Sequence, residues 1–394
     1  LLTTPFAPLC LIAMPGCEEL GAKINAWLMK WREQQEALED ATPLFGVLGA
    51  NRENFLIDVQ CPRFGNGEAK GMIRSSVRGY DLYILTDVGA YNVNYKMYGK
   101  SVPMSPDDHF QDLKRVIAAV GGRAKRINII MPLLYEGRQH RRSGRESLDC
   151  AMALQELESM GVSNIITFDA HDPRVQNAVP LIGFDSVKPT YQILKALLRN
   201  QTDLNLDRNH MMIVSPDEGA LDRNIFYASV LGIDMGLFYK RRDYTTVVDG
   251  RNPIIAHEYL GDSVEGKDVF VSDDILASGE SILDLARELK KRKANRIYAA
   301  ATFALFTSGL DAFNKAYEEG TLTRVIGTNL TYRRPELKDM PWFVEADMSK
   351  YISYIIASLN HDRSLSYLLN TYDRIRRLVS RYLEKQAENG IRLI

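Results

Sequence analysis

Cysteine is scarce in this sequence, and its positions exclude two common kinds of site. The four cysteines, Cys10, Cys17, Cys61 and Cys150, show no C-x-x-C spacing and no nearby cluster of histidines. This spacing argues against a zinc site, and a disulfide framework is not expected in a chain of 394 residues. A reducing cytoplasm is therefore the expected compartment.

The sequence also lacks an excess of charge and any long hydrophobic run. Its 49 basic and 50 acidic side chains leave a net charge of −1. Neither a basic surplus nor an apolar run of about 20 residues is present, so neither nucleic acid nor a membrane is expected as a partner. The N-terminal segment has no basic region of the kind that opens a signal peptide. Binding of a polyanionic small molecule would depend on local basic clusters.

Short apolar runs alternate with amphipathic stretches, a pattern typical of parallel α/β sheets. The pattern occurs twice and predicts two similar α/β domains, residues 1–185 and 186–340, followed by a charged helical tail, residues 341–394. The expected strands are Leu9–Ala13, Asp81–Leu85, Ile127–Met131, Ile165–Phe168, Met211–Val214, Met235–Phe238, Val269–Val271 and Ile297–Ala301. The expected helices are Glu18–Leu38, Pro106–Val120, Glu146–Met160, Pro189–Leu198, Leu221–Leu231 and Ser281–Lys293.

The most informative segment is VFVSDDILASGES, residues 269–281. A short apolar strand runs into Asp273 and Asp274, and small residues then lead into a helical pattern. This order builds a turn at the carboxyl end of a strand, where backbone N–H groups and a helix N-terminus can hold a phosphate. The paired acids suit the hydroxyls or the metal of a sugar phosphate. Taken alone, the loop also fits an ordinary acidic strand-to-helix turn.

This loop resembles the ribose-phosphate-binding loop of the type I phosphoribosyltransferase fold. Together with five further segments in the same order, it makes nearly the whole chain similar to the ribose-phosphate diphosphokinase (phosphoribosyl pyrophosphate synthetase) family. The resemblance implies an α/β fold of two phosphoribosyltransferase-like domains with parallel sheets and a C-terminal helical segment. It also implies ATP and ribose 5-phosphate as substrates, Mg²⁺ as cofactor, and a homo-oligomer, either a dimer or a hexamer.

The first motif, RFGNGE at residues 63–68, is assigned by this resemblance to the nucleotide. Phe64 would stack on the adenine of ATP bound in a neighbouring subunit, while Asn66 and Glu68 would bond the edge of the base. An aromatic face and an amide–carboxyl pair suit these tasks physically. A glycine-rich hairpin with a core phenylalanine is the alternative.

Two further motifs are assigned to the ATP phosphates. In MPLLYEGRQHRRSGRES, residues 131–147, Arg138 and Gln139 match a family Arg-Gln pair, and His140 stands where the family usually has Asp. In ITFDAHDPRVQ, residues 166–176, the resemblance assigns His171, helped by Asp169, to the Mg²⁺ that bridges the phosphates. A solvated basic loop and a hydrogen-bonded loop histidine are the alternatives.

The remaining motifs are assigned to ribose 5-phosphate and to catalysis. In IVSPDEGALDR, residues 213–223, Asp217 would contact the sugar phosphate or its metal. In FYKRRDY, residues 238–244, Lys240 and Arg242 match a mobile catalytic pair that stabilises charge in the transition state. The residues implied to hold the ribose phosphate are Asp217, Asp273, Asp274, Ser278, Gly279 and Ser281.

The phosphate loop departs from the family pattern at two positions, with Ala277 in place of a third Asp and Glu280 in place of a Gly. A carboxylate ~4 Å from a phosphate charge would cost about 4 kcal/mol at an effective dielectric constant near 20, so Glu280 is expected to point outward or to find a basic partner. Residues 30–54 resemble an insertion. The preferred function is therefore synthesis of phosphoribosyl diphosphate and AMP from ATP and ribose 5-phosphate. A catalytically silent regulatory subunit and a phosphoribosyltransferase remain the alternatives.

Overall fold

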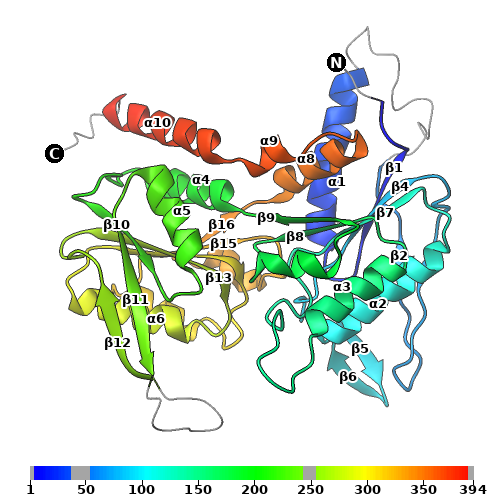
Figure 1. The fold of residues 1–394 in the computed structure, drawn as a ribbon, viewed down its shortest axis with the longest axis horizontal. Helices are drawn as coiled ribbons and strands as arrows, with labels where there is room; N and C mark the ends of the chain where they lie inside the picture. The colour runs from blue at the N-terminus through cyan, green and yellow to red at the C-terminus, as the bar shows by residue number, and fades with distance from the viewer. Residues whose placement is uncertain (1–3, 37–53, 243–253, 389–394) are drawn as a thin grey trace. The chain divides into compact units, whose positions relative to one another are not determined.

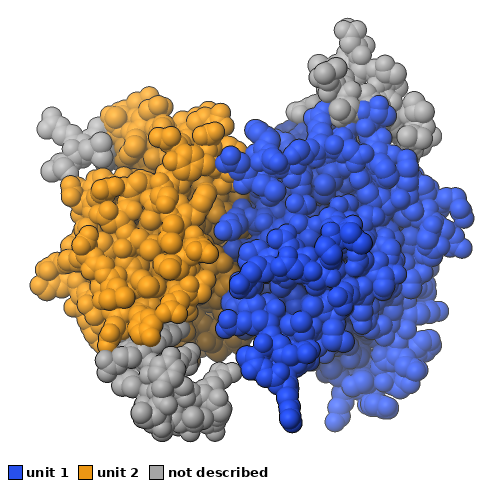
Figure 2. All heavy atoms as spheres, viewed as in Figure 1, with its two compact units in different colours: residues 1–188, 329–332, 347–370 blue, residues 189–328, 333–346, 371–394 orange. Residues whose placement is uncertain are grey.

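The computed structural model describes residues 4–36, 54–242 and 254–388, and the chain divides into two compact units (Figures 1 and 2). Unit 1 comprises residues 1–188, 329–332 and 347–370, and unit 2 comprises residues 189–328, 333–346 and 371–394. Each unit is thus assembled from separate stretches of the chain. Among the described helices, none is both long enough and apolar enough to cross a membrane.

Unit 1 is built on a five-stranded parallel sheet in the order β1-β4-β7-β8-β9. Its buried apolar side chains pack against α2 and α3 on one face, and α1 packs against α8. The strands are β1 (Leu9–Ala13), β4 (Asp81–Leu85), β7 (Arg126–Ile130), β8 (Asn164–Phe168) and β9 (Gly183–Val187). The helices are α1 (Glu18–Glu36), α2 (Pro106–Val120), α3 (Asp149–Ser159), α8 (Ser349–Asn360), α9 (Ser366–Leu369) and the 3₁₀ helix Pro173–Ala178. Two small antiparallel pairs are β2 (Val59–Gln60) with β3 (Met72–Ile73), and β5 (Asn94–Met97) with β6 (Lys100–Pro103).

Unit 2 is built on a seven-stranded sheet in the order β12-β11-β10-β13-β14-β15-β16, in which only β12 runs antiparallel to its neighbour among the described strands. One face packs on α6 and α7, and the other on α4, α5 and α10 (Figure 1). The strands are β10 (Met211–Ser215), β11 (Met235–Arg242), β12 (Ile254–Leu260), β13 (Asp268–Leu276), β14 (Ile297–Ala304), β15 (Arg324–Thr328) and β16 (Phe343–Ala346). The helices are α4 (Thr190–Asn200), α5 (Leu221–Leu231), α6 (Glu280–Lys291), α7 (Asp311–Glu318), α10 (Tyr372–Glu388) and the 3₁₀ helix Pro335–Asp339.

The strand order of unit 2 reverses between β10 and β13, because the chain proceeds from β10 to β11 on one side and later returns to β13 on the other. In open parallel sheets, a crevice forms outside the carboxyl ends of the strands at such a reversal, and ligands bind there. Asp217 follows β10, and Asp273 lies near the end of β13. The topology therefore brings two of the expected site residues to one place.

The eight expected strands and six expected helices all occur, with ends shifted by a few residues. The expected tail does not form a segment of its own. Residues 343–346 form the edge strand β16 of unit 2, helix α8 belongs to unit 1, and helix α10 belongs to unit 2. Strands β9, β12, β15 and β16 of the two main sheets were not predicted, and each of them carries polar or charged residues. Most of the insertion at residues 30–54 lies outside the described residues, although α1 extends to Glu36.

Candidate functional site

A pocket of about 140 Å³ opens in unit 2 where the strand order reverses. The end of β10, the end of β13 and the start of α6 enclose it, so that polar groups from three elements meet. Five of the six residues expected to hold a ribose phosphate line this pocket: Asp217, Asp273, Ser278, Gly279 and Ser281. The sixth, Asp274, is buried and does not line it; its carboxylate accepts a hydrogen bond from the backbone N–H of Ile275 at 2.9 Å.

Gly279 sets the shape of the phosphate loop. It adopts a left-handed φ of 87° immediately before α6, and a Cβ at this position would lie 2.2 Å from the Phe313 ring. A side chain is excluded here by both backbone conformation and space. The tight turn presents the N-terminus of α6 at the pocket, where N–H groups that lack a partner in the helix can bind an anion.

Glu280 occupies the first position of α6 and is exposed. It does not belong to the residues that line the pocket, in contrast to Ser278 and Ser281 on either side. A carboxylate at this position interacts favourably with the helix dipole. This placement agrees with the expectation that Glu280 points outward.

The carboxyl groups at the end of β13 form an acidic pair. Asp273 accepts a hydrogen bond from the Asp274 backbone N–H at 2.8 Å, and its carboxylate lies 3.6 Å from the Arg223 guanidinium. Burial and the neighbouring Asp274 carboxylate raise the pKa of Asp273 well above its usual value, and Arg223 only partly opposes this shift. A carboxyl group in this state favours a ligand that brings positive charge or hydroxyl donors.

The donor set of this pocket suits Mg²⁺ only when a substrate supplies further ligands. Within the described ranges, no three His, Cys, Asp or Glu side chains converge closely enough to hold a metal ion. Mg²⁺ is usually bound through one or two carboxylates, several waters and substrate phosphates. Asp217 and Asp273 provide carboxylates in the pocket, so the residues present fit this mode.

In unit 1, the RFGNGE segment forms a tight turn that displays Phe64. The Phe64 side chain is exposed by 55%, which excludes the alternative of a core phenylalanine. Asn66 and Glu68 are joined by a hydrogen bond of 2.9 Å from the Asn66 amide to the Glu68 carboxylate. The three residues assigned to the adenine thus lie together on one exposed turn.

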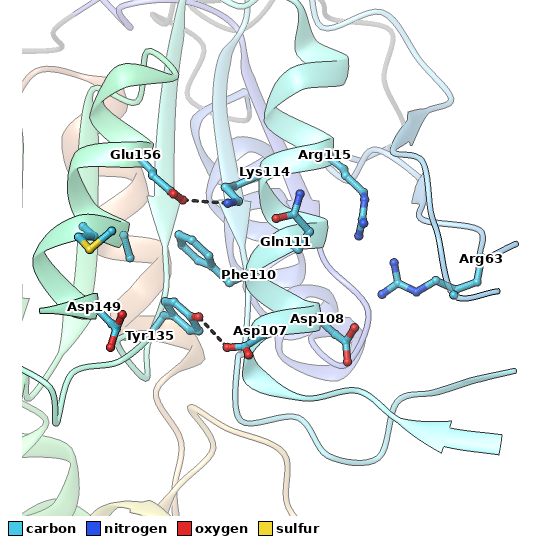
Figure 3. A pocket seen from close by; sticks show the side chains of 13 residues that line it. Arg63, Asp107, Asp108, Phe110, Gln111, Lys114, Arg115, Tyr135, Asp149 and Glu156 are labelled. Atoms are coloured by element: carbon cyan, nitrogen blue, oxygen red, sulfur yellow. Dashed lines mark hydrogen bonds and ion pairs between the residues drawn. The ribbon is translucent and has the colours of Figure 1, made fainter. Parts of the chain in front are cut away.

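Arg63 connects this turn to helix α2, on which its partner Asp112 lies. Its guanidinium donates two hydrogen bonds to the Asp112 carboxylate, at 2.7 and 2.9 Å, and both side chains are almost fully buried. Arg63 also borders a pocket of about 420 Å³ over α2 and α3 (Figure 3). In that pocket Lys114 of α2 pairs with Glu156 of α3 at 2.8 Å, and the Asp107 carboxylate accepts a hydrogen bond from the Tyr135 hydroxyl at 2.6 Å.

The residues assigned to the ATP phosphates follow β7 and β8 in unit 1. Arg138 is exposed, while the Gln139 amide donates to the Ser147 carbonyl oxygen at 2.9 Å and so closes its own loop. The His140 and His171 rings lie 5.3 Å apart between centroids, which brings these two motifs together. Asp169, at the end of β8, is buried and has a left-handed φ of 46°.

His140, which stands where the family usually has Asp, lies next to a carboxylate. Its Nε2 atom lies 3.6 Å from the Asp172 carboxylate, which also forms hydrogen bonds with Arg174. Hydrogen bonds from Arg174 lower the pKa of Asp172 to about 2. Asp172 therefore stays ionised next to His140, a contact that the sequence motif did not predict.

The expected catalytic pair lies at the edge of unit 2. The backbones of Lys240 and Arg242 belong to β11 and pair with His257 and Ile254 of β12, with an irregularity between Arg241 and Arg242. Their side chains lie outside the described part of the structure. Strand β11 thus carries both residues beyond its pairing with β10, which ends at Leu237, and β12 pairs alongside them.

Sequence reasoning missed Asn224, which lies one turn into α5 and is fully buried against the loops of the pocket. A polar residue on the inward face of an amphipathic helix would have been the signal for it. The neighbouring Arg223, which ends the IVSPDEGALDR motif, has the site carboxylate Asp273 as its ion-pair partner.

Comparison with known proteins agrees with this architecture. Residues 9–161 match the family model described as the N-terminal domain of ribose phosphate pyrophosphokinase, and residues 185–317 match the phosphoribosyl transferase domain. The chain is 28% identical over 317 residues to the ribose-phosphate pyrophosphokinase of Vibrio parahaemolyticus, covering 79% of this chain and 91% of that protein. It is 25% identical over 311 residues to the enzyme of the same name from Bacillus subtilis, covering 78% and 88%.

The fold is also found in a solved structure. The crystal structure of phosphoribosylpyrophosphate synthetase from Mycobacterium smegmatis aligns with a TM-score of 0.67 and 20% identity, covering 90% of this chain and 99% of that one. The two domain models occur in tandem, and the site residues of unit 2 gather at the reversal of the sheet. The chain belongs to the ribose-phosphate pyrophosphokinase family of enzymes.

Proposed function

We propose that this protein transfers the β,γ-diphosphoryl group of ATP to the anomeric hydroxyl of ribose 5-phosphate, giving phosphoribosyl diphosphate and AMP. The observation that carries the proposal is the pocket where Asp217, Asp273 and the N-terminus of α6 meet. The helix N-terminus and the Ser278 and Ser281 segment would bind the 5-phosphate, and the carboxylates would face the ribose hydroxyls.

Within this proposal, the chain contributes mainly binding and orientation. Phe64, Asn66 and Glu68 would hold the adenine, and Arg138, Gln139 and His171 the phosphates. Lys240 and Arg242 would neutralise charge on the transferring group, since in-line phosphoryl transfer depends on positioning and electrostatic stabilisation. In unit 2, Asp217 would hold Mg²⁺ together with the sugar phosphate, and in unit 1, Asp169 and His171 would hold Mg²⁺ together with the ATP phosphates. Bound Mg²⁺ would supply further charge neutralisation.

The exposed Phe64 supports the family expectation of a homo-oligomer. A phenylalanine exposed by 55% on a rigidly anchored turn is unusual unless a ligand or another subunit covers it. The proposed partner is a second copy whose ATP receives the ring, in a dimer or hexamer. A cytoplasmic location remains part of the proposal.

The test is a ³¹P NMR assay of purified protein with ATP, ribose 5-phosphate and Mg²⁺. New diphosphate resonances, with AMP in equal amount, are expected, and Asp273→Asn should reduce the rate at least tenfold. Asp284→Asn is the matched control, because Asp284 is an exposed acid on α6 that pairs with Arg287 outside the pocket. Absence of turnover in the wild-type protein would exclude the proposed reaction.

A silent regulatory subunit is the second candidate, and Ala277 is the observation that favours it. Ala277 lines the pocket, so one carboxylate of the family pattern is missing from the surface that would face the ribose. This second function is supported if the wild-type protein binds ATP without turnover and Lys240→Ala changes neither of these two results. Consumption of added phosphoribosyl diphosphate with a purine base would instead indicate a phosphoribosyltransferase.

A further inference from the structure

The backbone ladder between β10 and β13 stops just before the site. The two strands pair from Met211 with Asp268 up to Val214 with Val271, whereas β13 continues to pair with β14 as far as Leu276. Ser272, the next residue of β13, is fully buried, so its backbone N–H and C=O groups need partners other than water. The following residue is the site carboxylate Asp273.

The Asn224 side chain takes the place of the missing strand partner. Its Nδ2 donates to the Ser272 carbonyl oxygen at 2.8 Å, and its Oδ1 accepts from the Ser272 N–H at 3.2 Å. Asn224 is itself fully buried in α5. One carboxamide thus satisfies both backbone groups of the residue that precedes the acidic pair.

The same carboxamide is tied to the other wall of the pocket. Its Nδ2 also donates to the carbonyl oxygen of Ala220 at 2.8 Å and lies 3.4 Å from the Ser215 hydroxyl oxygen. The Ser215 hydroxyl in turn donates to the Asp217 carbonyl oxygen at 2.8 Å. A continuous set of hydrogen bonds therefore runs from the segment of Asp217, through Asn224, to the strand of Asp273.

We propose that Asn224 is a positioning residue that fixes the spacing of the Asp217 and Asp273 segments and thereby determines affinity for the ribose phosphate. This inference rests on the proposed function of the pocket. Its physical basis is that buried polar groups adopt one arrangement only when all are paired, and that small displacements of binding groups strongly weaken binding.

The experiment compares wild type with Asn224→Ala and uses Asn128→Ala as the matched control. Asn128 is an equally buried asparagine that bonds the Asp81 carboxylate and the Leu82 carbonyl oxygen, but it lies in the sheet of unit 1. Direct binding of ribose 5-phosphate is measured by isothermal titration calorimetry, and the KM for each substrate is measured by the release of AMP. Circular dichroism establishes that each variant is folded.

Asn224→Ala is expected to weaken ribose 5-phosphate binding at least tenfold while changing the KM for ATP less than threefold. Asn128→Ala should lower thermal stability without changing either constant. Where Asn224→Ala does not fold, Asn224→Asp takes its place, since it keeps the acceptor for the Ser272 N–H but loses the donor. The same tenfold weakening of ribose 5-phosphate binding is expected. Unchanged ribose 5-phosphate affinity in a folded Asn224 variant would overturn the inference. Lack of binding by the wild type would count against the proposed function instead.

Discussion

At the scale of single residues, the site is determined by where a side chain is absent as much as by where one is present. Gly279 permits the turn that exposes the N-terminus of α6, and Ala277 leaves part of the pocket without a carboxylate. Glu280, which the sequence alone presented as an obstacle to phosphate binding, lies outside the pocket lining. The tertiary structure thus removes the objection to phosphate binding that Glu280 raised, and the missing carboxylate at Ala277 remains.

Gly279→Ala is expected to destabilise unit 2 and to weaken phosphate binding. The left-handed φ of 87° and the 2.2 Å approach to Phe313 both oppose a Cβ, so a loss of about 2–4 kcal/mol is expected. Gly320→Ala is the control, because Gly320 has a φ of 69° but a Cβ there would meet no atom within 4 Å. Thermal unfolding should show a loss of only about 1 kcal/mol for the control; equal losses would contradict the role of Phe313.

Asp273 is expected to make the stability of the ligand-free protein depend on pH. Because its pKa is raised in the folded state, the folded protein holds this proton more tightly than the unfolded chain. The free energy of unfolding should therefore fall as pH rises from about 4 through the raised pKa. Asp273→Asn should flatten this dependence. Melting temperatures between pH 5 and pH 8 test it, and parallel curves for the two proteins would disprove it.

At the scale of elements, buried polar groups connect helix α8, from the expected tail, to the sheet of unit 1. Asp81, fully buried at the start of β4, accepts two hydrogen bonds from Arg126 at 2.8 and 2.7 Å. It also accepts one from the Asn360 amide at 2.9 Å, at the end of α8, and Arg126 bonds the Leu359 carbonyl oxygen. This network explains why part of the expected tail belongs to the first unit.

Arg126→Met is expected to lower the stability of unit 1 by about 3–5 kcal/mol, because it leaves the Asp81 carboxylate buried without its counter-charge. Lys293→Met is the control, since Lys293 pairs with Glu265 on the surface at 2.8 Å. Exposed pairs contribute little to stability, so the control should unfold at nearly the same denaturant concentration as the wild type. Chemical denaturation measures both changes, and a small loss for Arg126→Met would show that the network contributes little.

At the scale of the whole molecule, neither unit is a continuous piece of chain. Residues 347–370 return to unit 1 and residues 371–394 to unit 2, so the two domains expected at 1–185 and 186–340 lack parts of both units. In unit 2, the Tyr382 hydroxyl of α10 donates to the Gln201 carbonyl oxygen at 2.8 Å. Helix α8 is therefore part of unit 1, and helix α10 is part of unit 2.

A fragment of residues 1–340 is expected to aggregate or to remain largely unfolded. It lacks α8, whose Tyr351, Ile352, Ile355 and Ile356 are buried in unit 1, and it lacks β16 and α10 of unit 2. Circular dichroism and size-exclusion chromatography of the fragment, compared with the full chain, provide the measurement. A soluble fragment that unfolds cooperatively would show that the C-terminal helices are dispensable.

The sequence by itself determined the α/β class, eight of the twelve strands described in the two main sheets, the helices α1 to α6, and the residue types of the site, because these depend on local periodicity and on motifs of adjacent residues. It predicted Asp217, Asp273 and the phosphate loop as one site, and the structure brings them together. Tertiary structure alone decided that Asp274 does not line the pocket, and that Asn224 joins the segments of Asp217 and Asp273. It also decided that the expected tail divides between the two units. Those features depend on contacts between residues far apart in the chain, which no local pattern encodes.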